Sequence, residues 1–162
     1  SDVTKHANEI KKLIGEQKPD TIFCTDDSVE DASVFALEKH LEDFLVQNWK
    51  QTELGKNYDI FEEDGVTGQQ YKTDTGLIDI LAISKDKKTL LVVELKKGRA
   101  SDSVMGQIQR YMGYIKELAK DEQEVKGVII ALEDDLRIKR ALSVTNNIEF
   151  CRYQVSFKLL KH

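Results

Sequence analysis

The segment from Leu77 to Lys96 restricts the fold more than any other part of this sequence. Two runs within it, Leu77–Ser84 and Thr89–Leu95, are apolar at nearly every position, and a single polar break at 85–88 separates them. The pattern predicts two strands joined by a four-residue loop. Because neither strand has a polar face, we expect both to be central strands of a sheet whose two faces are covered.

The loop also sets the register of this hairpin. If Ser84 faces Thr89, then Asp79 falls opposite Glu94, because residues on antiparallel strands pair one by one. One face then carries Leu77, Asp79, Leu81 and Ile83 against Lys96, Glu94, Val92 and Leu90. The other face carries Ile78, Ile80 and Ala82 against Leu95, Val93 and Leu91. Two carboxylates and one ammonium are therefore expected at one end of an otherwise apolar face.

Asp79, Glu94 and Lys96 form the group with the clearest chemistry. Directly opposed side chains have Cβ atoms roughly 4.5–5.5 Å apart, and like charges there are destabilising. A divalent cation removes this repulsion, since Mg²⁺ is commonly held by one or two carboxylates together with water and phosphate oxygens. Lys96 can then orient or deprotonate an attacking water, or neutralise charge on a phosphate. The trio predicts a metal-dependent site that cleaves phosphodiesters; the competing interpretation is a plain ion pair at the end of the sheet.

The remaining sequence predicts further helices and strands around this hairpin. Helices are expected over 4–15, 29–49, 101–120 and 134–142, with Ser101 as the N-cap of the third. The second helix turns positions 34, 37, 41, 44 and 45 inward, and the third turns Val104, Ile108, Tyr111, Ile115 and Leu118 inward. Strands are expected over 21–24, 58–62, 66–73, 127–132 and 148–160. This order predicts an α/β fold with a central mixed sheet flanked by helices. Residues 1–33 are expected to form a helical appendage, and 34–162 the main domain.

Composition limits the class of protein. The 162 residues are 40% hydrophobic, which suits one globular core, and no apolar run approaches the roughly 20 residues that cross a bilayer. A net charge of −5 argues against nucleic-acid binding through bulk charge, so any such contact must be local. Cys24 and Cys151 are expected to be buried and reduced, and no zinc-site spacing is present. The start carries no secretory pattern, so a cytoplasmic protein with no membrane partner is expected.

The strand residues at the charged end follow a known pattern. Asp79, then Glu94-Leu95-Lys96 after a strand-length gap, resembles the signature of the PD-(D/E)XK nuclease superfamily, with Ile78 in place of the usual proline. The resemblance implies a restriction-endonuclease-like three-layer sandwich and a Mg²⁺ (or Mn²⁺) cofactor. It also implies that Asp79 and Glu94 are metal ligands, that the backbone carbonyl of Leu95 is a further ligand, and that Lys96 is the catalytic lysine.

Residues on two helices extend the resemblance. Glu42 lies in the helix before the sheet, where many members place an acidic residue that completes or supports the metal site; Glu38, one turn earlier, is the alternative. Gln107 and Tyr111 resemble the QxxxY element of RecB-like members, which implies that they brace the site or touch the substrate, although both also suit core packing. Over about 36–118 the chain resembles the nuclease domain of NucS-type endonucleases. The stretches that carry this similarity are 41–45, 75–79, 92–96 and 106–111.

The leading hypothesis is an endonuclease that hydrolyses DNA phosphodiester bonds with Mg²⁺ or Mn²⁺, as in DNA repair or restriction. Lys97, Arg99 and Arg110 surround the expected site and would contact phosphates without reading sequence. One alternative is a catalytically inactive nuclease-fold module that binds nucleic acid or a protein partner. Another is an unrelated α/β protein whose charges are structural. Many such relatives dimerise, which leaves a homodimer open. Because 1–33 is too short for the DNA-binding domain that NucS-type proteins place first, we expect that domain to be missing or separate.

Overall fold

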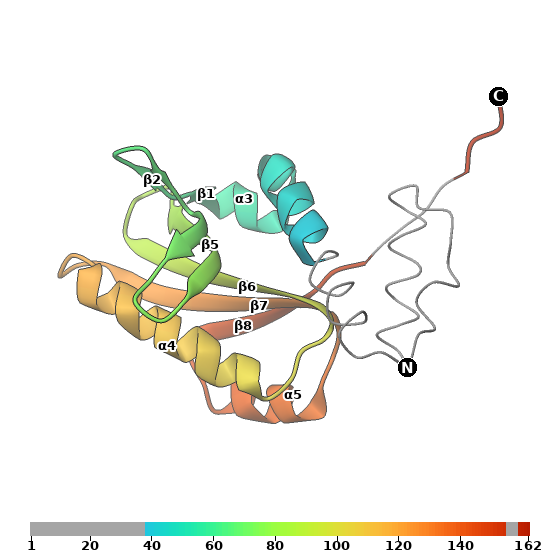
Figure 1. Ribbon diagram of the computed structural model, residues 1–162. Coiled ribbons are helices and arrows are strands. Elements are labelled where there is room, and N and C mark those ends of the chain that lie inside the picture. Colours follow the sequence, from blue (N-terminus) through green and yellow to red (C-terminus); the bar gives the residue numbers. More distant parts are fainter. Residues whose placement is uncertain (1–37, 155–158) are drawn as a thin grey trace.

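The central sheet of this protein lies between two helical layers (Figure 1). The computed structural model describes residues 38–154 and 159–162. Its elements, in chain order, are η2 (Trp49–Gln51), α3 (Glu53–Asn57), β1 (Tyr58–Ile60), β2 (Glu62–Glu63), β3 (Val66–Thr67), β4 (Gln69–Lys72), β5 (Leu77–Ser84), β6 (Thr89–Arg99), α4 (Ser103–Leu118), β7 (Glu124–Glu133), α5 (Leu136–Ser143) and β8 (Ile148–Arg152). A helix whose described part covers 38–47 precedes η2. The predictions for 1–33, Cys24 among them, fall outside the described residues.

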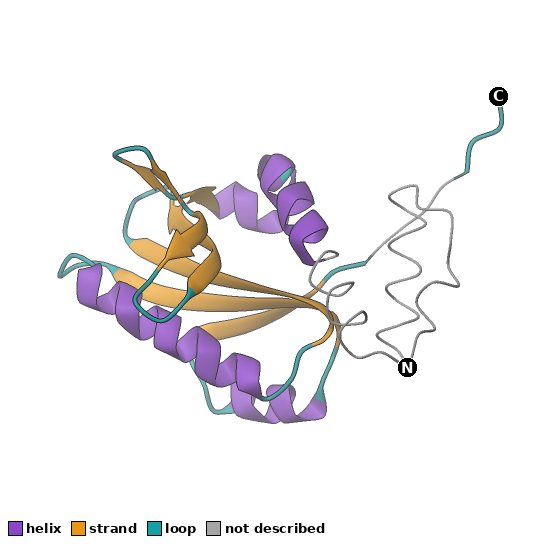
Figure 2. Cartoon of the chain, viewed as in Figure 1, coloured by secondary structure: helices purple, strands orange, loops and turns teal. Residues whose placement is uncertain are grey.

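The main sheet is mixed, as predicted. Its strand order is β1-β5-β6-β7-β8, and β4 pairs with β5 on the same side as β1. β5 and β6 are antiparallel, whereas β6, β7 and β8 run parallel to one another. The helix at 38–47 and α3 pack on one face, and α4 and α5 on the other (Figure 2). The prediction of a central mixed sheet flanked by helices is confirmed.

The predicted register of the β5–β6 hairpin is right for its apolar part. The ladder pairs are Ile80–Val93, Leu81–Val92, Ala82–Leu91 and Ile83–Leu90. The ladder ends there, so the pairs expected next, Asp79 with Glu94 and Leu77 with Lys96, are not formed. On its other side β5 stays paired with β4 as far as Leu77. The hairpin therefore opens directly before its acidic residues.

Two apolar clusters fill the spaces on either side of the sheet. One packs the sheet against α4 and α5 and contains Leu81; the other packs it against the helix at 38–47 and contains Ile80. We expected Ile78 beside Ile80, but it packs in the α4-side cluster. The alternation of β5 is thus interrupted at Asp79, where a regular strand would have kept Ile78 and Ile80 on one face.

A small hairpin of β2 and β3 branches off the edge of the sheet and divides the strands predicted over 58–62 and 66–73. Leu81 of β5 is shared at the branch: its carbonyl accepts from the amide of Phe61, and its amide donates to the carbonyl of Gly68. A Cβ at position 68 would collide with the Leu81 carbonyl oxygen, so glycine is required there. The edge of β5 therefore changes partner from β4 to β1 at Leu81.

Several helix boundaries differ from the prediction. The helix expected to reach residue 49 ends at 47, and Trp49 is buried in η2, where its Nε1 donates to the carbonyl of Tyr58. The N-cap position of α4 belongs to Asp102, whose side chain makes no capping hydrogen bond. Ser101, the predicted N-cap, instead shares a hydrogen bond between hydroxyl groups with Ser103.

Two residues expected in the core are exposed. Phe44 is 66% exposed because the helix at 38–47 turns Leu41 and Leu45 to the sheet instead. Leu118 is 59% exposed at the last turn of α4. Cys151, expected to be buried, is a free thiol that is only half-buried.

Strand lengths also differ from the prediction. β6 and β7 are longer than expected, because each finds a parallel partner along most of its length. β8 is shorter and stops at Arg152, the last residue that pairs with β7. Across the described residues, no helix combines the length and the apolar character needed to cross a membrane.

The turn between β4 and β5 leads into Asp79. Thr73 is buried in this turn and donates from its backbone amide and its hydroxyl to the carbonyl of Gly76, at 2.8 and 2.7 Å. Gly76 has a φ of 149°, which side chains of L-residues rarely allow. A Cβ there would lie 2.5 Å from the hydroxyl oxygen of the buried Tyr111. Glycine at position 76 thus lets α4 pack closely against the turn.

Replacing Gly76 by alanine is expected to destabilise the protein by about 1–3 kcal/mol, because the added methyl group meets Tyr111 and the backbone is held in a strained conformation. Urea denaturation of the wild type and G76A measures the difference in the free energy of unfolding. Adding Tyr111→Phe, which removes the contacting oxygen, should restore part of the loss. Equal unfolding midpoints for the wild type and G76A would contradict this packing.

Candidate active site

Asp79 and Glu94 lie where β5 and β6 separate. The amide of Leu95 donates to Asp79 Oδ2 at 2.8 Å, so the Asp79 side chain on β5 holds the backbone of β6. Glu94 lies close enough for the charge of Asp79 to act on it. The two acidic groups come together as the sequence predicted, but a side-chain hydrogen bond to Leu95 takes the place of a regular ladder pair.

Burial makes the two carboxylates hard to ionise. Glu94 is 1% exposed, and burial, with added repulsion from Asp79, raises its pKa to about 8. Burial likewise raises the pKa of Asp79 to about 6, and the charges of Glu42 and Glu38 add to the effect. Lys96 attracts both carboxylates and lowers their pKa values, but by less than burial raises them. Lys96 alone therefore does not hold both carboxylates in their ionised form, which a bound cation would favour.

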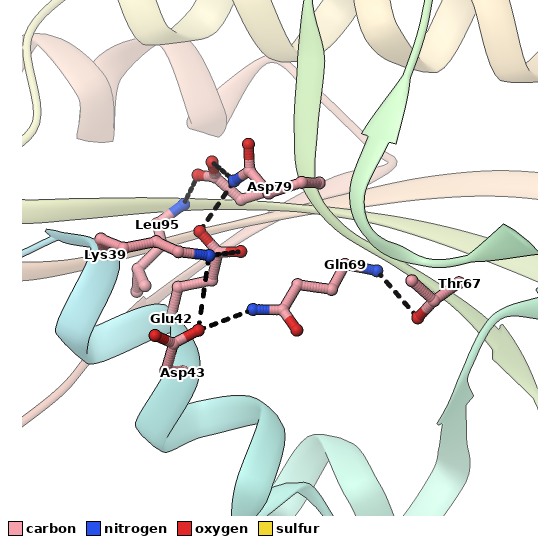
Figure 3. A network of polar contacts seen from close by, with 8 residues as sticks. Lys39, Glu42, Asp43, Thr67, Gln69, Asp79 and Leu95 are labelled. Atoms are coloured by element: carbon pink, nitrogen blue, oxygen red, sulfur yellow. Dashed lines mark hydrogen bonds and ion pairs between the residues drawn. The ribbon is translucent and has the colours of Figure 1, made fainter.

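Glu42 joins this pair from the helix at 38–47. It is buried and lies next to Asp79 (Figure 3). The Nε2 atom of Gln70 donates to Glu42 Oε2 at 2.7 Å and to Asp79 Oδ1 at 3.4 Å. Its other oxygen, Oε1, makes no hydrogen bond within the described structure and lies 3.6 Å from Lys39 Nζ. The structure thus places Glu42 beside Asp79, as predicted. Sequence reasoning missed Gln70, because regular alternation gives no sign that its amide reaches both acids.

Glu38 lies near the same end of the sheet but makes a different contact. Its Oε1 accepts from the backbone amide of Lys97 at 3.1 Å, and burial raises its pKa. Just beyond this contact β6 shifts register against β7, and Gly98 adopts a φ of 77°. Glu38 therefore fixes the end of β6 that carries Lys96, while Glu42 is linked to Asp79. The geometry favours Glu42 over Glu38 as the helix residue that joins the carboxylate pair.

Gln107 and Tyr111 are not brought to the carboxylates by any contact among the described residues. Tyr111 is buried in the α4-side core, and Gln107 is partly exposed on the same helix. Tyr111 therefore packs in the core, which was the alternative that its sequence position left open.

The three residues expected to contact phosphates lie in different situations. Lys97 is 3% exposed, because the surrounding structure covers it, and its contact with phosphates stays a prediction. Arg110 is exposed on α4. The side chain of Arg99 falls outside the described residues.

The donor set of the site fits a divalent cation that prefers oxygen ligands, such as Mg²⁺ or Mn²⁺, better than a metal that prefers thiolate or imidazole ligands. The described residues contain no group of three or more His, Cys, Asp or Glu side chains arranged to hold a metal by themselves. What they provide is carboxylate oxygens, of which Glu94 Oε1 and Glu42 Oε1 are buried without a hydrogen-bond partner in the described structure. Mg²⁺ is held in this manner, with one or two carboxylates and the remaining positions filled by water and phosphate oxygens. The amide of Leu95 is engaged with Asp79; the role of its carbonyl as a ligand stays a prediction.

Comparison with known proteins places the chain in a family. Residues 37–156 match the family described as the endonuclease NucS C-terminal domain. The chain belongs to this family. It is 31% identical over 98 residues to endonuclease NucS from Methanocaldococcus jannaschii and 30% identical over 92 residues to endonuclease NucS from Sulfolobus acidocaldarius. The matches cover 60% and 56% of this chain but 36% and 34% of those proteins, so the chain spans about a third of the length of these relatives.

Solved structures agree with this family at the level of the fold. A crystal structure of a repair endonuclease from Pyrococcus abyssi aligns with a TM-score of 0.57 and 20% identity, over 72% of this chain and 46% of the other. The structure of an EndoMS-dsDNA2 complex aligns with a TM-score of 0.59 and 21% identity, over 75% of this chain and 46% of the other. The predicted kinship with NucS-type endonucleases is confirmed, and the part that matches is their C-terminal domain.

The buried charge of Glu94 leads to a pH-dependent prediction for the metal-free protein. Its ordinary pKa is 4.5, and burial raises this value to about 8 in the folded state. Between these two values the unfolded state binds fewer protons than the folded state, so this residue's contribution to stability falls as pH rises. Glu94→Gln cannot ionise. The free energy of unfolding of E94Q relative to wild type should therefore increase from about pH 5 to about pH 8.

Urea denaturation in the presence of EDTA, repeated across that pH range, measures this difference. Glu122→Gln is the matched control, because Glu122 is exposed and its replacement should produce no pH-dependent change. A difference between E94Q and wild type that stays constant or shrinks with rising pH would contradict the burial of a repelled charge at Glu94.

Proposed function

We propose that this domain is a nuclease domain of the PD-(D/E)XK type, with a restriction-endonuclease-like fold, that hydrolyses DNA phosphodiester bonds with Mg²⁺ or Mn²⁺. The observation that carries the proposal is the pair of half-buried Asp79 and buried Glu94, held where two core strands separate, with pKa values that Lys96 does not bring back to the ordinary range. Membership in the NucS C-terminal domain family supports the same chemistry, since the matched relatives are named endonucleases.

Each residue of the site has a role that follows from its position. Asp79 and Glu94 would hold the cation, with Glu42 and the carbonyl of Leu95 as further oxygen donors. The cation, when bound, supplies positive charge that stabilises negative charge on the phosphate in the transition state. Lys96 follows Glu94 by two residues on β6, so its ammonium would lie close enough to orient or deprotonate the attacking water.

DNA is the proposed substrate, and its binding has to be local in a protein with a net charge of −5. Arg110 is exposed on α4 and would contact the backbone without reading sequence. One structural neighbour is a complex with double-stranded DNA, which supports a duplex as the first substrate to test. Because the chain spans about a third of its curated relatives, a separate DNA-binding domain remains part of the proposal. A homodimer and a cytoplasmic location remain predictions.

Cleavage assays with labelled single-stranded, duplex and mismatched DNA in Mn²⁺ test the enzyme. Asp79→Ala and Lys96→Ala should each lower the rate by about 10²–10⁴-fold, because one removes a cation ligand and the other the group that acts on the attacking water. Lys88→Ala is the matched control: Lys88 is exposed on the loop at the other end of the same hairpin, so its loss should leave the rate unchanged. If wild type cleaves every substrate no faster than the background rate, or if wild type and K96A cleave at equal rates, the enzymatic proposal is wrong. DNA binding without cleavage would favour the inactive module instead.

The cation itself is tested by calorimetric titration with Mn²⁺. We expect weak binding to wild type and none to Asp79→Ala, because removal of one carboxylate leaves too few oxygen donors at the site. Asp86→Ala is the control, since Asp86 lies in the exposed loop of the hairpin. Identical heats for wild type and D79A would show that Mn²⁺ binds elsewhere or not at all.

A further inference from the structure

Two successive glutamines of β4 reach the same helix, although a regular strand would send them to opposite faces. Gln69 Nε2 donates to Asp43 Oδ1 at 2.9 Å, and Gln70 Nε2 donates to Glu42 Oε2 at 2.7 Å. The backbone explains how both amides point the same way, because Gln70 has a φ of 52° in the left-handed region. That turn of the backbone redirects the side chain of Gln70 toward the helix at 38–47.

A left-handed glutamine is an unusual choice at this point. The region is strained for residues that carry a Cβ, and glycine, asparagine and aspartate adopt it most readily. Such conformations persist only where the surroundings hold them, and they concentrate at functional sites. Here the Gln70 amide is fixed by contacts to Glu42 and Asp79. The strained backbone and the two side-chain contacts therefore belong to one arrangement.

Gln70 is the group that connects Glu42 and Asp79. Its single Nε2 atom donates to both, at 2.7 and 3.4 Å, and so links the helix at 38–47 to β5. The two carboxylates repel each other, which contributes to the raised pKa of Asp79. An amide NH₂ group has two protons to donate and carries partial positive charge, so it can hold two acidic groups together. Gln69, in contrast, contacts Asp43 and does not reach Asp79.

We infer that Gln70 is a positioning residue of the cation site, which holds Glu42 and Asp79 in a fixed relation so that a divalent cation meets carboxylates already in place. The inference rests on the proposed function, since it concerns the same site. Groups that hydrogen-bond to metal ligands orient them, and their removal typically weakens metal affinity by about 10–100-fold. Gln70 acts on both carboxylates at once, and it does so from a strand that carries no ligand itself.

The chain offers a matched pair of variants. Gln70→Ala and Gln69→Ala each remove one amide contact to the helix at 38–47, but only the first removes the link between Glu42 and Asp79. Calorimetric titration should show Mn²⁺ binding weakened by about tenfold or more in Q70A and by less than about twofold in Q69A. Gln70→Asn distinguishes the effect of side-chain length from that of backbone conformation. Asparagine tolerates the left-handed region, but its shorter side chain should not contact both acids, so Q70N should resemble Q70A.

A second measurement needs no metal. The amide of Leu95 donates to Asp79 Oδ2, so its hydrogen exchange in the cation-free protein reports how firmly Asp79 is held. Exchange at Leu95 should be several-fold faster in Q70A and Q70N than in Q69A. If Q70A does not fold, Q70N carries the same comparison.

The outcomes separate this inference from the proposed function. If wild type binds Mn²⁺ but Q70A and Q69A match each other in affinity and in Leu95 exchange, the role of Gln70 is overturned and the cation site stands. Tighter Mn²⁺ binding by Q70A would also overturn it, since Gln70 would then compete with the cation. If wild type gives the same heats as Asp79→Ala, the cation site itself fails, and the role assigned to Gln70 fails with it.

Discussion

The hydrogen bond from the Leu95 amide to Asp79 is the interaction on which the rest of this site depends. Past Ile80 and Val93 the ladder stops, and the Asp79 carboxylate accepts from the Leu95 amide. A backbone donor of β6 is thus satisfied by a side chain of β5, which lets the strands separate without leaving that amide unpaired. The same contact fixes the half-buried Asp79 beside the buried Glu94.

The position of Asp79 and Glu94 raises their pKa values and involves polar groups of neighbouring elements. Burial raises the pKa of both carboxylates, and the attraction of Lys96 does not offset it. Polar groups from the surrounding elements contact the site. The side-chain amide of Gln70 on β4 links Asp79 to Glu42, and Glu38 accepts from the backbone amide of Lys97. The strained backbone at position 70 is part of the same arrangement.

Much of the fold could be predicted because apolar patterning over long strands leaves few alternatives. The loop at 85–88 set the register of β5 and β6, and the four ladder pairs agree with it. The charged end could not be predicted in detail, because side chains there compete with the backbone for hydrogen bonds and break the alternation at Ile78. The burial of Lys97 and the hydroxyl contact of Tyr111 were likewise hidden, since both depend on what packs against them.

The sequence by itself determined the mixed sheet with helices on both faces and the register that brings Asp79 near Glu94, because hydrophobic period and strand register follow from local order along the chain. The tertiary structure alone decided how these acids are held. Gln70 contacts Asp79 because its backbone is left-handed, which the residue pattern of the strand does not predict. Gly76 is needed because Tyr111, from a helix distant in sequence, packs on the turn. Contacts between elements far apart in the chain depend on packing in three dimensions, which the pattern of residues along one strand does not contain.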